Sequence, residues 1–364
     1  MSLSRTVARL FPVPRYLSPH AAGIDITDAS IKWVALRPQG DHFRVSSWGE
    51  VKLEPGIVES GTVKNEKALA EALVTIRKQL GGIRVAHAAL PEEGAFVFSM
   101  RVPTVKKEEI ESMIEFELVG RVPVPVQQMI YDYDIIDDHP GAVGTEIGVV
   151  AFARDIIEPY VHAFDEAGIT LMSMEVEARS IARAVSSRDG TDPVSLLVDS
   201  GKSRTGFAIL KKGFPIFTST VDVGGKDLTR VVVETLKVNE DEAQVFKNEV
   251  GLIPKDPARK AATEALEKVA QTLAGEIERH YRFWDTRRND HGDRVTPVEQ
   301  VLLVGGSSNL MGLDDYVAGK VHAHTERPNV WRHVAPFDEY IPPIDFRTSL
   351  QYVTAIGLAL RGTI

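Results

Sequence analysis

The sequence has no cysteine, which excludes disulfide bonds, thiolate metal sites and cysteine nucleophiles. It has no apolar run near the ~18 residues that a membrane-spanning helix needs. Positive charge is also in deficit, because 42 Lys and Arg stand against 51 Asp and Glu, for a formal net charge of −9. This balance argues against broad nucleic-acid binding, which requires a basic stripe.

What remains is typical of a soluble protein with a buried core. The 364 residues are 43% hydrophobic and 26% charged. At about 150 residues per domain, this length predicts two globular lobes.

The first twenty residues do not resemble a secretory signal, because arginines are interleaved with the apolar positions and prolines interrupt them. Arg5, Arg9 and Arg15 carry the charge. One interpretation is a short amphipathic basic helix that touches a membrane surface or a partner. The other, which we favour, is a tail that folds onto the body or frays.

Two segments share one design. Residues 23–36 and 196–210 each place apolar residues on both sides of a polar turn, which predicts a strand, a turn and a second strand. Asp25 aligns with Asp199 in this comparison. The chain therefore carries a weak internal repeat, which indicates two related lobes that each open with a hairpin.

Strands and helices are expected to follow in each half. The alternation over 43–52 predicts a strand, and the apolar spacing over 65–80 predicts a helix. In the second half we expect a strand over 214–223, a helix after Gly225, a long helix over 258–289, a polar break over 289–297 and a short buried strand over 301–304. Between the halves lies a separate α+β block over 95–168.

Three turns follow buried strands, where open α/β sheets place their ligands. The first spans Asp25 to Ser30 and the second Asp199 to Thr205. Such turns present backbone N–H groups to phosphate oxygens, and an Asp at a strand end holds Mg²⁺ through its water shell. The third is Gly305-Gly306-Ser307, where glycine lets the backbone approach a nucleotide closely. The alternative is that both aspartates only cap their turns.

The order of these motifs resembles the actin-like nucleotide-binding superfamily. Within it, the sequence is most similar to the PilM family of type IV pilus assembly proteins, which are related to FtsA. The resemblance spans about 21–362 and rests on the opening at 23–32, the position of the inserted block, and the segments 223–229 and 242–247. It implies an α/β fold of the actin-like (ribonuclease H-like) type, duplicated into two lobes, with an inserted α+β subdomain.

The resemblance also implies residue roles. ATP and Mg²⁺ would be the cofactors, with Asp25 and Asp199 beside the metal. Glu177 would polarise an attacking water, unless it is only an exposed helix residue. The residues implied to bind the cofactor are Asp25, Ser30, Lys32, Asp199, Gly201, Thr205, Gly225, Gln244, Lys247, Gly305, Gly306 and Ser307.

Three departures from the family pattern bear on this expectation. Thr27 replaces a usual glycine, Asp28 brings a carboxylate into a loop that should meet phosphates, and Gln244 replaces a usual glutamate. Like charges at about 4 Å repel by roughly 4 kcal/mol at an effective dielectric near 20. Lys202 and Arg204 in the opposite turn could offset Asp28. We therefore expect nucleotide binding and at most weak ATPase activity.

The expected domains follow the resemblance. Residues 1–20 form a tail, residues 95–168 the inserted subdomain, and residues 191–334 the second lobe with the adenosine motif. The first lobe is assembled from three segments, which are residues 21–94, 169–190 and 335–364.

The expected function is that of a cytoplasmic ATP-binding scaffold, recruited to the inner face of the cytoplasmic membrane. It would dock the N-terminal cytoplasmic tail of PilN, contact other pilus assembly platform proteins, touch the membrane only indirectly and bind no nucleic acid. The groove candidates are Phe96, Phe98, Met113 and Phe116, each of which core packing explains equally well. Self-association, an FtsA-like filament-forming membrane-associated ATPase and a nucleotide-free docking scaffold stay open as alternatives.

Overall fold

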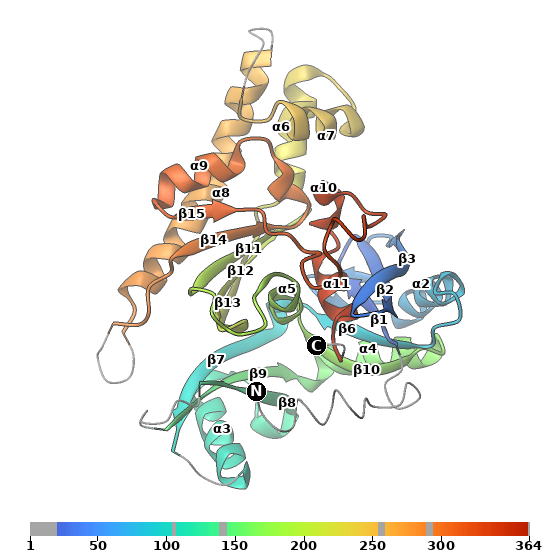
Figure 1. Cartoon of the computed structure of the whole chain (residues 1–364), viewed down its shortest axis with the longest axis vertical. Helices are drawn as coiled ribbons and strands as arrows, with labels where there is room; N and C mark the ends of the chain where they lie inside the picture. Colours follow the sequence, from blue (N-terminus) through green and yellow to red (C-terminus); the bar gives the residue numbers. More distant parts are fainter. Residues whose placement is uncertain (1–19, 104–106, 138–143, 254–258, 289–293, 363–364) are drawn as a thin grey trace.

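The computed structural model describes residues 20–103, 107–137, 144–253, 259–288 and 294–362. Residues 1–19 of the expected tail and residues 289–293 of the expected polar break lie outside this range. In Figure 1 the first lobe lies at the right, the second lobe above and to the left, and the inserted block at the bottom.

The first lobe is built on a five-stranded sheet with the order β10-β6-β1-β2-β3. Its opening hairpin is antiparallel, with Asp25 opposite Lys32. β6 pairs in parallel with β1, and β10 pairs in parallel with β6. The strands are β1 (Ala22–Ile26), β2 (Ser30–Gln39), β3 (His42–Lys52), β6 (Val85–Leu90) and β10 (Thr170–Val176).

Two helices contribute buried side chains to one core with this sheet. α2 (Glu66–Gln79) begins at Asn65, whose side chain accepts a hydrogen bond from the Ala68 N–H. Its buried residues pack in the same apolar cluster as Tyr160 and Phe164 of α4 (Arg154–Glu166). The small hairpin of β4 (Val58–Glu59) and β5 (Thr62–Val63) lies between β3 and α2 in the sequence.

The second lobe repeats this topology. Its strands run in the order β15-β14-β11-β12-β13, which matches β10-β6-β1-β2-β3 position by position, with an antiparallel hairpin and two parallel neighbours. The strands are β11 (Ser195–Ser200), β12 (Thr205–Lys211), β13 (Phe214–Val221), β14 (Gln300–Val304) and β15 (His324–Glu326). The internal repeat expected from the two Asp-containing turns is therefore present in the sheets.

Within the described residues, four helices belong to this lobe. α8 is the expected long helix, and its buried stripe includes Leu266, Leu273 and Ile277. These side chains share one core with the sheet. The helices are α6 (Gly225–Leu236), α7 (Glu240–Glu249), α8 (Lys260–Thr286) and α9 (Leu313–Val321).

The inserted block has the expected order of strand, helix, two strands and helix. Its strands are β7 (Ala95–Val102), β8 (Met129–Asp137) and β9 (Thr145–Ala153), and α3 (Lys107–Arg121) follows β7. The block is not separate, because β7 meets β13 at the pair Phe98–Phe217 and makes one eight-stranded sheet with the second lobe. Its last helix, α4, packs in the core of the first lobe.

The lobes also share an apolar core between their sheets. α5 (Glu177–Val185) and α11 (Val353–Ala359) pack against each other there, together with residues from both sheets. Gly357 makes this approach possible, because a Cβ at that position would lie 1.8 Å from the Ser180 carbonyl oxygen. α10 (Phe346–Ser349) precedes α11.

Candidate functional site

The first turn joins β1 to β2 at the mouth of the cleft between the lobes. Asp25 is 5% exposed, and its Oδ1 has no hydrogen-bond partner among the described residues. Thr27 closes the turn, because its N–H donates to the Ser30 carbonyl at 2.9 Å and its hydroxyl bonds the Ser30 backbone. Lys32 donates to Ser30 Oγ at 2.9 Å and pairs with Glu50 at 3.3 Å. Thr27 thus supports the turn that a glycine usually forms.

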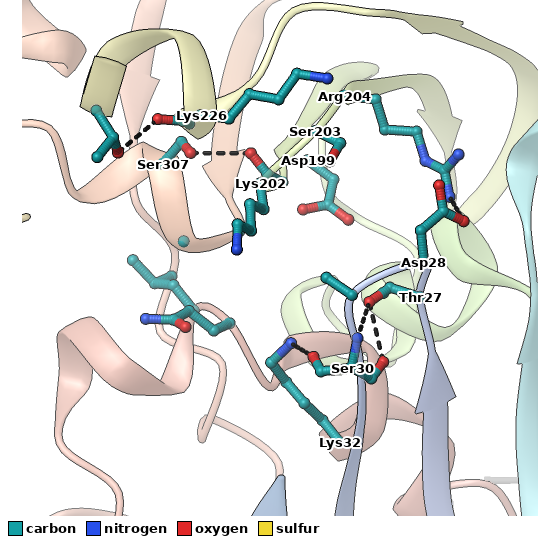
Figure 2. A pocket seen from close by; sticks show the side chains of 18 of the residues that line it. Thr27, Asp28, Ser30, Lys32, Asp199, Lys202, Ser203, Arg204, Lys226 and Ser307 are labelled. Carbon is teal, nitrogen blue, oxygen red and sulfur yellow. Dashed lines mark hydrogen bonds and ion pairs between the residues drawn. The ribbon is translucent and has the colours of Figure 1, made fainter. Parts of the chain in front are cut away.

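The second turn joins β11 to β12 and faces the first. Asp199 lies in β11, beside the point where the turn begins, and its side chain points into the space between the turns (Figure 2). The Gly201 N–H donates to the Arg204 carbonyl at 2.9 Å, which closes the turn. Thr205 is fully buried and its hydroxyl donates to the Val223 carbonyl at 2.7 Å. Thr205 therefore joins the end of the second turn to the segment after β13 through a buried hydrogen bond.

The third turn follows β14 and is hydrogen-bonded to the second turn. Gly305 has φ +82°, and a Cβ there would lie 2.4 Å from Asp199 Oδ1, so only glycine fits. Ser307 donates from its hydroxyl to the Gly201 carbonyl at 2.9 Å. Gly306 lies between them and begins a short 3₁₀ turn (Gly306–Asn309).

The N-terminus of α6 and one face of α7 form the outer wall. The Gly225 N–H donates to the Gly201 carbonyl at 2.9 Å, and a Cβ on Gly225 would lie 2.2 Å from Ser307 Oγ. Lys247 is 4% exposed, and its Nζ donates to Thr229 Oγ1 at 2.7 Å. Burial lowers the pKa of Lys247 to about 8. Gln244 stands one turn before Asn248 and donates to its side-chain oxygen at 3.2 Å.

These elements enclose a cavity of about 720 Å³, within the usual range of small-molecule sites. All but one of the residues predicted to form the site line it, the exception being Thr205. The predicted residues that line it are Asp25, Ser30, Lys32, Glu177, Asp199, Gly201, Gly225, Gln244, Lys247, Gly305, Gly306 and Ser307.

Buried carboxyl groups dominate the electrostatics of the cavity. Burial raises the pKa of Asp25 to about 6, although the positive charges of Lys32 and Arg204 lower it. Burial and the charge of Asp25 raise the pKa of Asp199 to about 7. Glu177 begins α5 in the cavity wall, where burial and the two aspartates raise its pKa well above the usual value. It is therefore not an exposed helix residue. The cluster favours a bound cation, which would offset the cost of ionising these groups.

Asp28 also lines the cavity, and its carboxylate is bonded to other groups of the protein. It accepts hydrogen bonds from the Ser60 and Gly61 N–H groups, each at 3.1 Å. Its carboxylate also lies 3.3 Å from the Arg204 guanidinium, and Figure 2 shows the two side chains facing each other. Arg204 thus supplies the offset that the sequence suggested. Lys202 extends from the second turn into the cavity lining.

Sequence reasoning missed two carboxylates that follow β6. Glu92 accepts a hydrogen bond from the Ala178 N–H at 2.7 Å, and burial raises its pKa to about 7. Glu93 pairs with Arg204, which also pairs with Asp28. This arginine of the second turn therefore contacts two carboxylates of the first lobe. The available signal was Pro91-Glu92-Glu93-Gly94 directly after a buried strand.

The donor set fits a phosphate-bearing ligand with a hydrated Mg²⁺. In the described ranges no group of three or more His, Cys, Asp or Glu could hold a metal ion. Mg²⁺ usually keeps several waters and takes only one or two carboxylates, which matches Asp25 and Asp199.

No helix within the described part of the chain is long and apolar enough to cross a membrane.

Comparisons with known proteins agree on the fold. A family model described as type IV pilus assembly protein PilM matches residues 23–363. The cell division protein FtsA of Bacillus subtilis (strain 168) is 21% identical over 252 residues, which cover 63% of this chain and 57% of FtsA. The chain thus spans little more than half the length of that curated relative.

Solved structures extend this agreement over nearly the whole chain. A PilM–PilN type IV pilus biogenesis complex aligns with a TM-score of 0.76 at 21% identity, over 96% of this chain and 100% of that one. The ethanolamine utilization protein EutJ from Carboxydothermus hydrogenoformans aligns at 0.54 and 19% identity, over 96% and 91%. MreB5 of Spiroplasma citri bound to AMPPNP aligns at 0.52 and 12% identity, over 94% and 96%. The fold is therefore actin-like.

Proposed function

The chain belongs to the family of type IV pilus assembly protein PilM, and from this premise we propose a docking scaffold of the pilus assembly machinery that binds Mg-ATP in its cleft. The inserted block, in this proposal, receives the N-terminal cytoplasmic tail of PilN. The family match supports the first part, and the resemblance to a PilM–PilN complex supports the second.

The observation that carries nucleotide binding is the meeting of three strand-end turns around one cavity. Ser30, Lys32 and Gly201 line the cavity and would face the phosphates. Asp25 and Asp199 would hold the water shell of Mg²⁺, which supplies positive charge against the phosphates and the buried carboxyls. The ribose and base would lie against the outer wall, between the third turn and the face of α7 that carries Gln244 and Lys247. MreB5, which shares the fold, was solved with AMPPNP.

The same site supports binding more than hydrolysis. Glu177 is the one residue proposed as a catalytic base, and burial among carboxyls raises its pKa well above the usual value. A raised pKa lowers the fraction of Glu177 that is ionised and free to accept a proton from water. We therefore propose that the nucleotide stabilises the scaffold and turns over slowly at most.

Isothermal titration with Mg-ATP tests this part. We expect saturable binding that weakens at least tenfold in Asp199→Asn, because the amide cannot offer negative charge to the hydrated metal. Asp132→Asn is the matched control, since Asp132 is exposed on β8 outside the cavity lining. Absence of heat at millimolar Mg-ATP, or equal binding by Asp199→Asn, contradicts nucleotide binding and leaves a nucleotide-free scaffold.

The proposed PilN site lies at the seam between α3 and β7. Phe98 belongs to the core, because it is 8% exposed and the Arg121 guanidinium covers its ring at 4.7 Å. Phe96 and Met113 are partly buried at the edge of that core, where an extended apolar peptide can add contacts. Phe116 lies outside the seam, since it is 79% exposed on the outer face of α3.

Fluorescence polarisation with a labelled peptide of the PilN tail tests the docking. We expect Phe96→Ala and Met113→Ala to weaken binding about tenfold, a loss of roughly 1.4 kcal/mol. Phe337→Ala is the control, because Phe337 is partly exposed outside the inserted block. Equal affinities for all variants contradict the seam. ATP-dependent pelleting with lipid vesicles would favour the filament-forming alternative.

A further inference from the structure

The outer face of α3 carries large apolar side chains in solvent. Phe116 and Val119 are 79% and 72% exposed, and their spacing of three residues places them on one side of the helix. The opposite side is the buried one, with Ile114 and Leu118 in the core of the block. Figure 1 shows α3 at the lower edge of the molecule, covering the strands of the block on one side only. Two such neighbours on the solvent side of the helix mark a contact surface.

Negative charge surrounds these apolar residues. Residues 107–137 contain eight acidic and two basic side chains, a formal net charge of −6 out of −9 for the whole chain. Glu109 and Glu115 are exposed on α3, and Asp132 is exposed on the adjacent strand β8. One of the two cations, Arg121, is paired with Glu117 at 2.9 Å. The surface therefore favours an occupant that is both basic and apolar.

The chain itself contains a segment with this composition. Residues 1–19 include three arginines and no acidic residue. Leu3, Val7 and Leu10 recur at helical spacing, with Arg5 and Arg9 between them. No other stretch of nineteen residues outside the described ranges exists to cover the face.

The segment is long enough to reach α3. Nineteen residues span up to about 60 Å when extended. A compact chain of 364 residues has a radius of gyration of about 21 Å. Residues 1–19 join the described chain at His20, two residues before β1. In extended form the segment is therefore about as long as such a body is wide.

We propose that residues 1–19 dock on the outer face of α3, with their apolar side chains on Phe116 and Val119 and their arginines on the surrounding carboxylates. The contact is intramolecular and covers the outer face of α3. It is independent of nucleotide and of PilN, because neither the cleft nor the seam at Phe96 contributes to it.

The absence of cysteine allows spin labels to be placed cleanly in the full chain. One label at Ser4→Cys is paired with a second at Gly120→Cys on α3, where a Cβ meets nothing within 4 Å. The matched control pairs Ser4→Cys with Gly275→Cys, an equally open glycine on α8. Double electron–electron resonance should give one narrow population of short distances for the first pair and a broad, longer distribution for the control.

Two sets of variants then decide the contact. Phe116→Ser with Val119→Ser removes the apolar face, and Arg5→Glu with Arg9→Glu reverses the tail charge without touching the folded body. Each should abolish more than half of the short-distance population. The proposal is overturned if the distances between the labels at positions 4 and 120 are broadly distributed and neither set of variants changes them. A short distance that appears only between singly labelled chains in a mixture, or only with anionic lipid vesicles, overturns it in favour of a second copy or a membrane.

Discussion

Arg204 holds two carboxylates of the opposite lobe at once. Its guanidinium lies 3.3 Å from Asp28 and also pairs with Glu93, and all three side chains are largely shielded from solvent. Partly buried pairs of this kind are costly to break on one side, because the remaining charge loses its partner. Asp28, which looks unfavourable beside a phosphate turn in the sequence, therefore serves a contact between the lobes.

Glu92 makes the stability of the protein depend on pH. Burial raises its pKa from 4.5 to about 7, although the hydrogen bond from the Ala178 N–H opposes this shift. Below pH 4.5 the group is protonated in both states. As pH rises from 4.5 to 7, the unfolded chain releases a proton that the folded chain keeps, so stability falls by about 3 kcal/mol at about 1.4 kcal/mol per unit.

Glu92→Gln should remove this loss, because the amide keeps an oxygen for Ala178 and cannot ionise. Relative to the wild type, the variant should therefore gain up to about 3 kcal/mol between pH 5 and pH 8, measured by urea unfolding at both values. Glu109→Gln, with its side chain in solvent, is the matched control. A constant difference between Glu92→Gln and wild type at the two pH values would refute this account.

The residues that the sequence pattern itself identified, apart from those that the family resemblance implied, lie at the ends of repeated strands. Asp25 and Asp199 could be found because the same strand–turn–strand pattern occurs twice. Glu92 has no counterpart in such a pattern, and it reaches the cavity only because β6 lies beside β1 in the sheet. Sheet order is a tertiary property, so the sequence alone does not place the residues that follow β6 beside those that follow β1.

At the level of elements, the packing of α5 against α11 depends on one missing side chain. A Cβ on Gly357 would lie 1.8 Å from the Ser180 carbonyl oxygen, closer than non-bonded atoms can approach. Gly357→Ala should therefore force the helices apart and cost about 1–3 kcal/mol. At about 2–4 °C per kcal/mol, calorimetry should detect a lower melting temperature.

Gly275→Ala is the control for that substitution. Gly275 is also inside a helix, but a Cβ there meets nothing within 4 Å. Alanine should stabilise α8 by up to about 1 kcal/mol, since it loses less backbone entropy than glycine. If both variants changed the melting temperature in the same direction, close packing at Gly357 would not explain the effect.

Helices and strands were predictable where their periodicity is local. The spacing of Leu69, Leu73 and Ile76 indicated α2, and the alternation over 43–52 indicated β3. The union of the inserted block with the second lobe was not predictable. It depends on a single pair, Phe98–Phe217, between strands far apart in the sequence, and neither strand carries a local mark of its neighbour.

For the whole molecule, two kinds of contact hold the lobes together. An apolar cluster around α5 and α11 lies between the two sheets. It includes Val34 from one sheet and Leu197 from the other. Arg204 crosses the cleft on the open side. Between them lies the cavity with its buried carboxyls. The apolar cluster joins the two sheets, and the charge of Arg204 offsets that of the carboxyls around it, so its loss should favour a more open cleft.

Arg204→Ala should therefore widen the cleft without unfolding the protein. Resonance energy transfer between dyes at Lys78→Cys on α2 and Lys268→Cys on α8, both exposed, reports the separation of the lobes. We expect lower transfer in Arg204→Ala than in wild type without nucleotide, and recovery with Mg-ATP, whose metal compensates the carboxyl charge. Arg282→Ala, which removes an exposed pair with Glu278 within α8, should change nothing. Equal transfer in Arg204→Ala and wild type would show that the apolar cluster alone sets the closure.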